Sequence, residues 1–288
     1  MEFTENKIQQ IIREKLSLQV HSITENTKGI DQDVWIIETN EQKIVLKHPK
    51  NNNKIRNNRE VIACNLLAKL DIIVPQILYV DDQILIETFL EGNLVDQVDF
   101  SKVSRYDLYF NAGQILEKIH SITTTNFGMV TDDSLVGEFS TQVEYLQADL
   151  GELLNLEKTP FYSQEDIKQV LQYFESNKSI LENSPSVLLH ADYSDSNLVY
   201  TPDGKIAVID FGDLSIGNPM LDVTKMYLDH IGDGAFQAFI DGYGEINIEQ
   251  VKLFALCWLI WLIPALWKRN NSQERVKRLC HVFESIWK

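Results

Sequence analysis

Acidic and amide side chains gather in one short stretch of this chain, with a spacing that suits phosphoryl transfer. Asp192 and Asn197 flank a tight loop, and Asp210 ends the second strand of the hairpin that follows. Phosphoryl transfer needs a carboxylate beside the acceptor hydroxyl and oxygen ligands that hold Mg²⁺ against the nucleotide phosphates. These three residues can supply both kinds of group.

The segment that follows the loop is predicted to form a β-hairpin. Two apolar runs, residues 197–200 and 205–210, flank an Asp-Gly pair, which is a favoured hairpin turn. The hairpin brings the outer ends of its strands together, so Asn197 and Asp210 can converge on one metal ion. Asp192 is then left close by in the chain, where it can meet the acceptor.

The order of these motifs resembles that of the aminoglycoside phosphotransferase family, whose relatives include choline and ethanolamine kinases. The matching features are His-Ala-Asp at 190–192, Asn197, Asp-Phe-Gly-Asp at 210–213, and the segment SIGNPMLD at 215–222. That family usually has His-Gly-Asp, whereas this chain has Ala191 in the glycine position.

The resemblance implies a role for each matching residue. Asp192 would be the catalytic base, Asn197 and Asp210 would be the Mg²⁺ ligands, and His190 would anchor the loop. Asp222 is expected only as a residue that begins a helix. The other acidic residues of the segment have alternatives: Asp195 either shapes the loop or contacts the substrate, and Asp213 either caps a helix or lies in the outer shell of the metal.

The resemblance also places the donor nucleotide, ATP or GTP, in the first part of the chain. Lys47 ends an apolar run and would contact the α- and β-phosphates, and Glu60 in the next helix would pair with it. Lys43 and Lys50 are rivals for this role, but neither directly follows the apolar run. The loop expected to cover the phosphates, residues 25–33, has a single glycine and is a weak signal.

Four further residues are expected around the nucleotide base. The segment ILIETFLEG resembles the connection between two lobes, so backbone groups near Glu87 and Phe89 would hydrogen-bond the base. Leu198 and Ile209 would pack on its two faces.

The chain as a whole is predicted to be α+β, with the two lobes of a protein-kinase-like fold. Five alternating apolar segments before residue 91 predict an antiparallel five-stranded sheet, with a polar loop up to residue 58 and an inserted helix at 59–70. Long helical patterns dominate afterwards. We therefore expect a nucleotide-binding lobe at 1–91 and a larger, helical catalytic and substrate-binding lobe at 92–288.

The composition excludes several classes of protein. With 26 basic against 42 acidic residues the formal charge is −16, which argues against a nucleic-acid partner and suits either a cationic substrate or simple solubility. Three widely spaced cysteines and a polar N-terminal segment predict a reduced, cytoplasmic protein. The uncharged run at 253–267 is too short for a membrane span and predicts a buried helix.

The acceptor is expected to be small. No Arg follows His190, and the segment after Asp213 is too short for the activation loop of a protein kinase. Asp195, Asp229 and Asp233 are candidate contacts for an amine-rich acceptor. Three tryptophans at 258, 261 and 267 could form an aromatic cage for choline, although they lie in the most apolar run, which favours packing.

These observations predict a Mg²⁺-dependent phosphotransferase that acts on a hydroxyl group of a small cationic molecule. An aminoglycoside antibiotic is the favoured acceptor, which implies antibiotic resistance. The alternatives are a kinase for choline, ethanolamine or a sugar, and a nucleotide-binding pseudokinase, which the weak phosphate loop and Ala191 would suit.

Overall fold

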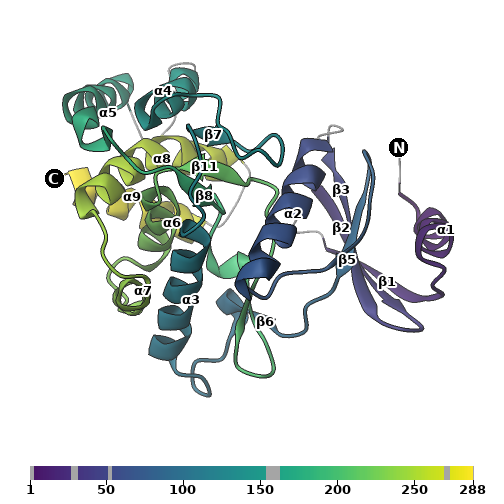
Figure 1. The fold of residues 1–288 in the computed structure, drawn as a ribbon. Helices are drawn as coiled ribbons and strands as arrows, with labels where there is room; N and C mark the ends of the chain where they lie inside the picture. The colour runs from purple at the N-terminus through teal and green to yellow at the C-terminus, as the bar shows by residue number, and fades with distance from the viewer. Residues whose placement is uncertain (1–2, 27–31, 51–53, 154–162, 269–272, 288) are drawn as a thin grey trace. The chain divides into compact units, whose positions relative to one another are not determined.

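The chain divides into two compact units, each described separately. The computed structural model describes residues 3–26, 32–50, 54–153, 163–268 and 273–287 (Figure 1). The first unit comprises residues 1–98, 131–133 and 195–214, and the second comprises 99–130, 134–194 and 215–288. The hairpin that carries Asn197 and Asp210 therefore belongs to the first unit, whereas a single boundary after residue 91 had been expected.

A five-stranded antiparallel sheet dominates the first unit, which confirms the predicted architecture. Its strands follow the order β1-β2-β3-β5-β4. Their bounds are Val20–Asn26 for β1, Gln32–Thr39 for β2, Lys43–Pro49 for β3, Ile77–Val80 for β4 and Leu85–Thr88 for β5. The side chains of β3 lie in two different environments, because successive side chains of a strand point to opposite faces of the sheet.

Two helices cover the opposite faces of this sheet (Figure 1). Helix α1 (Glu5–Leu16) packs Ile8 and Ile12 into a core cluster that includes Ile44 and Leu46 of β3. Lys47 points to the other face, toward helix α2 (Lys54–Leu67).

Helix α2 begins earlier than predicted, at Lys54 rather than residue 59. Residues 54–58, which were assigned to the polar loop, are helical, and tertiary contacts satisfy side chains among them: Asn57, for example, donates to the carbonyl oxygen of Asp81 over 3.2 Å.

A three-stranded sheet fixes the hairpin in the first unit. Strand β9 (Leu198–Tyr200) pairs with β10 (Ile206–Val208) on one side and with the short β6 (Asn93–Leu94) on the other. Gly92 has a φ of 144°, and its Cα lies so close to the carbonyl group of Tyr200 that no Cβ would fit. The backbone amide of Val208 also donates to the carbonyl oxygen of Ile73 over 2.9 Å, so both hairpin strands are anchored.

The second unit is predominantly helical, as predicted. Its helices are α3 (Arg105–His120), α4 (Gln142–Leu153), α5 (Gln164–Asn177), α6 (Met220–His230), α7 (Ala235–Tyr243), α8 (Ile248–Lys268) and α9 (Gln273–Trp287). A small antiparallel sheet of β7 (Gly128–Met129), β11 (Ser215–Gly217) and β8 (Val187–Leu189) lies among them.

Helix α8 contains the uncharged run that could have suggested a membrane span. Phe254, Leu259 and Ile263 are buried in it, as expected for a core helix. Of the helices that the structure describes, none has the length and apolar character needed to cross a bilayer.

Candidate active site

Lys47 lies in a buried ionic cluster of the first unit. Its Nζ atom is 2.7 Å from Oε1 of Glu60 and 2.9 Å from Oε1 of Glu87. The other oxygen of Glu60 accepts the backbone N–H of Phe211 over 3.0 Å. The structure thus brings together the lysine and glutamate that the sequence pairs, and it connects them to the Asp-Phe-Gly-Asp segment.

The two rival lysines have other surroundings. Lys43 lies near Glu38 and Glu91 and over the ring of Phe89. Lys50 pairs with the partly exposed Asp33 at 3.4 Å. Both are more exposed than Lys47, which is only 5% exposed, and the role of Lys47 in phosphate binding stays a prediction.

Burial and the neighbouring charges together shift the pKa values of Lys47 and Glu87. Burial opposes the charge of Lys47, but the carboxylates of Glu60, Glu87 and Asp210 outweigh it and raise the pKa of Lys47 above its ordinary value. Burial raises the pKa of Glu87 to about 7, although Lys47 acts in the opposite direction. The lysine is therefore charged throughout the neutral range, whereas Glu87 changes its charge within it.

One face of α2 holds the Asp-Phe-Gly-Asp segment in place. Arg56 lies 2.6 Å from the carboxylate of Asp213 and 4.0 Å from that of Asp210. Arg59 donates to the carbonyl oxygen of Gly212 over 3.2 Å, and a side chain on Gly212 would collide with the guanidinium of Arg56.

Sequence reasoning missed both arginines, although Arg56 precedes Arg59 by three residues and Glu60 by four, which is the spacing of one helical face. Asp213, for which a cap or an outer-shell role was expected, forms an ion pair with Arg56 of α2, and its expected outer-shell role stays a prediction.

The residues expected to hold Mg²⁺ lie at one end of the hairpin. The backbone N–H of Ile209 donates to the carbonyl oxygen of Asn197 over 3.0 Å, which places Asn197 beside the residue that precedes Asp210. In the described ranges no group of three or more His, Cys, Asp or Glu forms a metal centre. One carboxylate and one amide oxygen fit Mg²⁺, because this ion commonly takes one or two protein ligands and completes its shell with phosphates and water.

The residues expected around the base have varied positions. Leu198 is fully buried, and Ile209 is half-buried. The N–H of Phe89 already donates to the carbonyl oxygen of Lys43 over 3.1 Å, within the sheet. The side chain of Glu87 points to Lys47. Glu87 pairs with Val45 and Leu85 pairs with Lys47, and these two cross-strand pairs lie on the same face of the sheet. Base contacts through the backbone of Glu87 and Phe89 stay a prediction.

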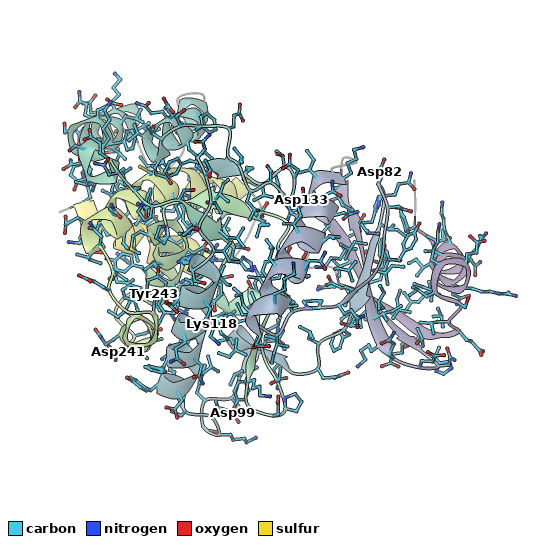
Figure 2. The ribbon with its side chains drawn as sticks, in the orientation of Figure 1. Asp82, Asp99, Lys118, Asp133, Asp241 and Tyr243 are labelled. Carbon is cyan, nitrogen blue, oxygen red and sulfur yellow. The ribbon has the colours of Figure 1, made fainter. Side chains whose placement is uncertain are left out.

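In the second unit, Asp222 organises the loop that carries Asp192. Its two carboxylate oxygens accept the backbone N–H groups of His190 and Ala191, over 2.7 and 2.8 Å. His120 lies 3.2 Å from the same carboxylate, and its other ring nitrogen lies 2.8 Å from the hydroxyl of Tyr243, which is labelled in Figure 2. Asp222 was expected only to begin a helix. It does lie in the first turn of α6, but it is fully buried and holds the loop.

The carboxylate of Asp192 has a basic neighbour that sequence reasoning missed. Lys225 of α6 lies 2.7 Å from Oδ1 of Asp192. Asp222 and Lys225 are three residues apart and so share a face of α6, where one holds the backbone of the loop and the other its carboxylate. His190 is fully buried, and its Nδ1 accepts the backbone N–H of Asp192 over 3.2 Å, consistent with the expected anchor.

Replacing Lys225 with methionine is expected to lower kcat about tenfold, with little change in the KM for the nucleotide. The ammonium group fixes one rotamer of Asp192, and without it the carboxylate samples unproductive orientations. Steady-state kinetics measure the effect. Lys252→Met is the matched control, since Lys252 pairs with the exposed Glu249 of its own helix at 3.2 Å. An equal loss in both variants would contradict the assignment.

Ala191 has a φ of 67°, in the left-handed region that glycine adopts without strain. Ala191→Gly is therefore expected to raise the free energy of unfolding by about 0.5–1 kcal/mol, less than the full strain because glycine also frees the unfolded chain. Urea unfolding measures the change. Ala148→Gly, at an exposed position of α4, should instead lower stability by a similar amount.

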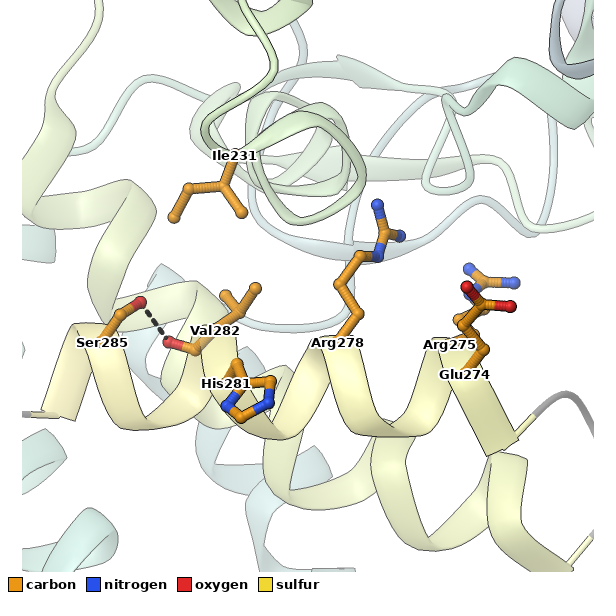
Figure 3. Close-up of a pocket in the computed structure, with 7 residues that line it drawn as sticks. All are labelled: Ile231, Glu274, Arg275, Arg278, His281, Val282 and Ser285. Carbon is orange, nitrogen blue, oxygen red and sulfur yellow. Dashed lines mark hydrogen bonds between the residues drawn. The ribbon is translucent and has the colours of Figure 1, made fainter.

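The acidic residues expected to contact the acceptor already have partners or lie in a turn. Asp229 pairs with Arg275 and Arg278 of α9, over 3.6 and 3.4 Å, and these arginines line a pocket along that helix (Figure 3). Asp233 pairs with Arg105 at 2.6 Å and accepts the N–H of Ala235 at the start of α7. Asp195 begins a single 3-10 turn, Asp195–Asn197, in the first unit. Their roles in acceptor binding stay predictions.

Comparison with known proteins adds an independent line of evidence. A sequence model described as "phosphotransferase enzyme family" matches residues 22–254, more than half of the chain. The structure is similar to the crystal structure of aminoglycoside phosphotransferase APH(4)-Ia, with a TM-score of 0.76, 15% identity and coverage of 98% of both chains. It is also similar to ADP-bound aminoglycoside phosphotransferase APH(2'')-Ib, with a TM-score of 0.70, 22% identity and coverage of 97% of both.

A further solved structure, of a thermostable mutant of APH(4)-Ia, is a ternary complex with ADP and hygromycin B; its TM-score is 0.74, with 14% identity and coverage of 97% of both chains. These likenesses confirm the predicted fold. Among curated proteins, an uncharacterized MG356 homolog from Mycoplasma pneumoniae is 30% identical over 81 residues, which span 26% of this chain and 29% of that protein.

Proposed function

Because the chain belongs to the phosphotransferase enzyme family, we propose that it transfers the γ-phosphate of ATP or GTP to a hydroxyl group of a small molecule. The observation that carries this proposal is the connection from Lys47 through Glu60 to the backbone of Phe211. It joins the lysine that would bind the phosphates to the Asp-Phe-Gly-Asp segment, which begins with the expected metal ligand Asp210. The set of Asp192, Asn197 and Asp210 argues against a pseudokinase, because pseudokinases usually lack one of the catalytic acids and this chain keeps all three residues.

Each residue then has a defined task. Lys47 would bind the α- and β-phosphates, and Asn197 and Asp210 would hold Mg²⁺, which neutralises charge on the phosphates when it is bound. Asp192 would orient the acceptor hydroxyl and accept its proton as the new bond from oxygen to phosphorus forms and the bond to the nucleoside diphosphate breaks. Lys225 would keep Asp192 in the required orientation.

We propose an amine-rich acceptor of the aminoglycoside type. The formal charge of −16 supports it, because an acidic protein attracts polycations. Structural relatives with bound hygromycin B or gentamicin support it as well. Such a reaction would confer antibiotic resistance, and we place it in the cytoplasm, where ATP is available.

A panel of acceptors tests the proposal. The purified protein is incubated with Mg²⁺ and either ATP or GTP, together with aminoglycosides, choline, ethanolamine or simple sugars, and products are identified by mass spectrometry. We expect a phosphorylated aminoglycoside. Turnover of only choline or a sugar would overturn the acceptor class, and nucleotide binding without any transfer would overturn the activity.

A further inference from the structure

Lys47 has two carboxylate partners, and they are not equivalent. An ammonium group has three N–H donors, and here two of them are directed to Glu60 and Glu87, at 2.7 and 2.9 Å. Glu60 is satisfied at both oxygens, since the second accepts the backbone N–H of Phe211. The second oxygen of Glu87 is buried and has no hydrogen-bond partner in the part of the chain that the structure describes.

This arrangement is electrostatically costly. The cluster holds one positive and two negative charges at positions that are 5% exposed or less. A buried carboxylate oxygen without a partner loses the hydration that it has in water. An uncharged side chain at position 87 would avoid this cost. The presence of a carboxylate there therefore implies a function that is connected with Lys47.

We propose that Glu87 competes with the nucleotide phosphates for Lys47, so that its ionised carboxylate lowers the affinity of the protein for the nucleotide. This inference rests on the proposed function, because it takes Lys47 as the phosphate-binding lysine. When a nucleotide binds, the negative charge of Glu87 lies beside the negative phosphates and repels them. Glu60 has a different role, because it also holds the Asp-Phe-Gly-Asp segment and keeps Lys47 in place.

The competition should depend on pH. The groups that face Glu87 are Lys47 on β3, Glu60 and Cys64 on α2, and Asp210 after β10. Burial raises the pKa of the Cys64 thiol, which stays neutral in this range. The pKa of Glu87 is about 7, so the carboxyl group is mostly protonated at pH 6 and ionised at pH 8. Affinity for the nucleotide should therefore fall as pH rises through 7.

Glu87→Gln tests this inference because glutamine keeps the shape and removes the charge. Calorimetric titration with ADP in the absence of Mg²⁺ should show about five- to tenfold tighter binding by the variant at pH 8, as expected for the loss of one charge near the phosphates. At pH 6 the two proteins should agree within about twofold, since wild-type Glu87 is then mostly neutral. Protonation of ADP itself cancels in the ratio of the two dissociation constants.

Two further variants separate the explanations. Glu41→Gln removes the same charge from the exposed turn between β2 and β3 and should leave ADP affinity unchanged. Glu60→Gln should weaken binding, because Lys47 and Phe211 lose their common partner. An equal gain in Glu41→Gln and Glu87→Gln would overturn the inference, as would a Glu87→Gln variant that binds no tighter at pH 8 than the wild type.

The wild-type protein provides a test that does not depend on the folding of a variant. Its ADP affinity, corrected for the titration of ADP, should fall about fivefold or more between pH 6 and pH 8. A flat profile would overturn the inference while the proposed function stands. A wild-type protein that binds no ADP at any pH would instead overturn the proposed function.

Discussion

Replacing Asp192 with asparagine is expected to lower kcat by about a thousandfold while nucleotide binding is unchanged. The amide keeps the size of the carboxylate and can still accept from Lys225, which lies 2.7 Å from Oδ1 in the native protein. It cannot accept the proton of the acceptor hydroxyl. Single-turnover transfer to the best acceptor of the panel, together with ADP titration, measures the two effects separately.

The control for this prediction is Asp203→Asn in the hairpin turn, where Asp203 is exposed and pairs with Lys205 at 2.9 Å. The same chemical change there should alter neither kcat nor ADP binding. If Asp192→Asn retained full transfer activity, Asp192 would not be the base. If it lost ADP binding as strongly as turnover, its role would lie in nucleotide binding.

Asp210→Asn is expected to abolish the dependence of nucleotide binding on Mg²⁺ and to lower kcat by about a thousandfold. Asp210 has a φ of 63°, a left-handed conformation that asparagine tolerates well, so the backbone should be preserved. The substitution therefore removes mainly one charged ligand. In the native protein this carboxylate also lies 3.5 Å from the side-chain amide of Gln32.

Calorimetric titration with ADP, with and without Mg²⁺, measures this effect directly. Wild-type protein should bind more tightly when Mg²⁺ is present, and Asp210→Asn should bind equally in both conditions. Asp210→Ala would be a poorer choice, because alanine adds backbone strain at this φ. An Asp210→Asn variant with the Mg²⁺ dependence of the wild type would show that the metal is held elsewhere.

The fold could be predicted because its signals are local. The alternation of apolar residues predicted all five strands of the first sheet. Apolar periodicity likewise predicted that the second unit is helical, although it did not predict the short helix α7. The start of helix α2 was also missed, because its first turn is largely polar and its start depends on contacts such as that of Asn57 with Asp81.

The candidate site was predictable only in part. The pairing of Lys47 with Glu60 came from the resemblance to the aminoglycoside phosphotransferase family, together with the position of Lys47 after an apolar run. The side chain of Glu87 shows where this reasoning ends, since it is directed to Lys47 by the register of β3 against β5, which no local pattern marks. Arg56 and Lys225 were missed because their partners lie far away in the sequence, and no local pattern marks a side chain that meets such a partner.

The sequence by itself determined which residues of the stretch from 190 to 213 could do chemistry, and it determined the fold class, because motif spacing and apolar periodicity are properties of neighbouring residues. Only the tertiary structure decided how those residues are held. Asp222 accepts two backbone amides of the loop, Arg56 pairs with Asp213, and Glu87 shares Lys47 with Glu60. These contacts join segments distant in the chain, and packing, register and burial together set their energies.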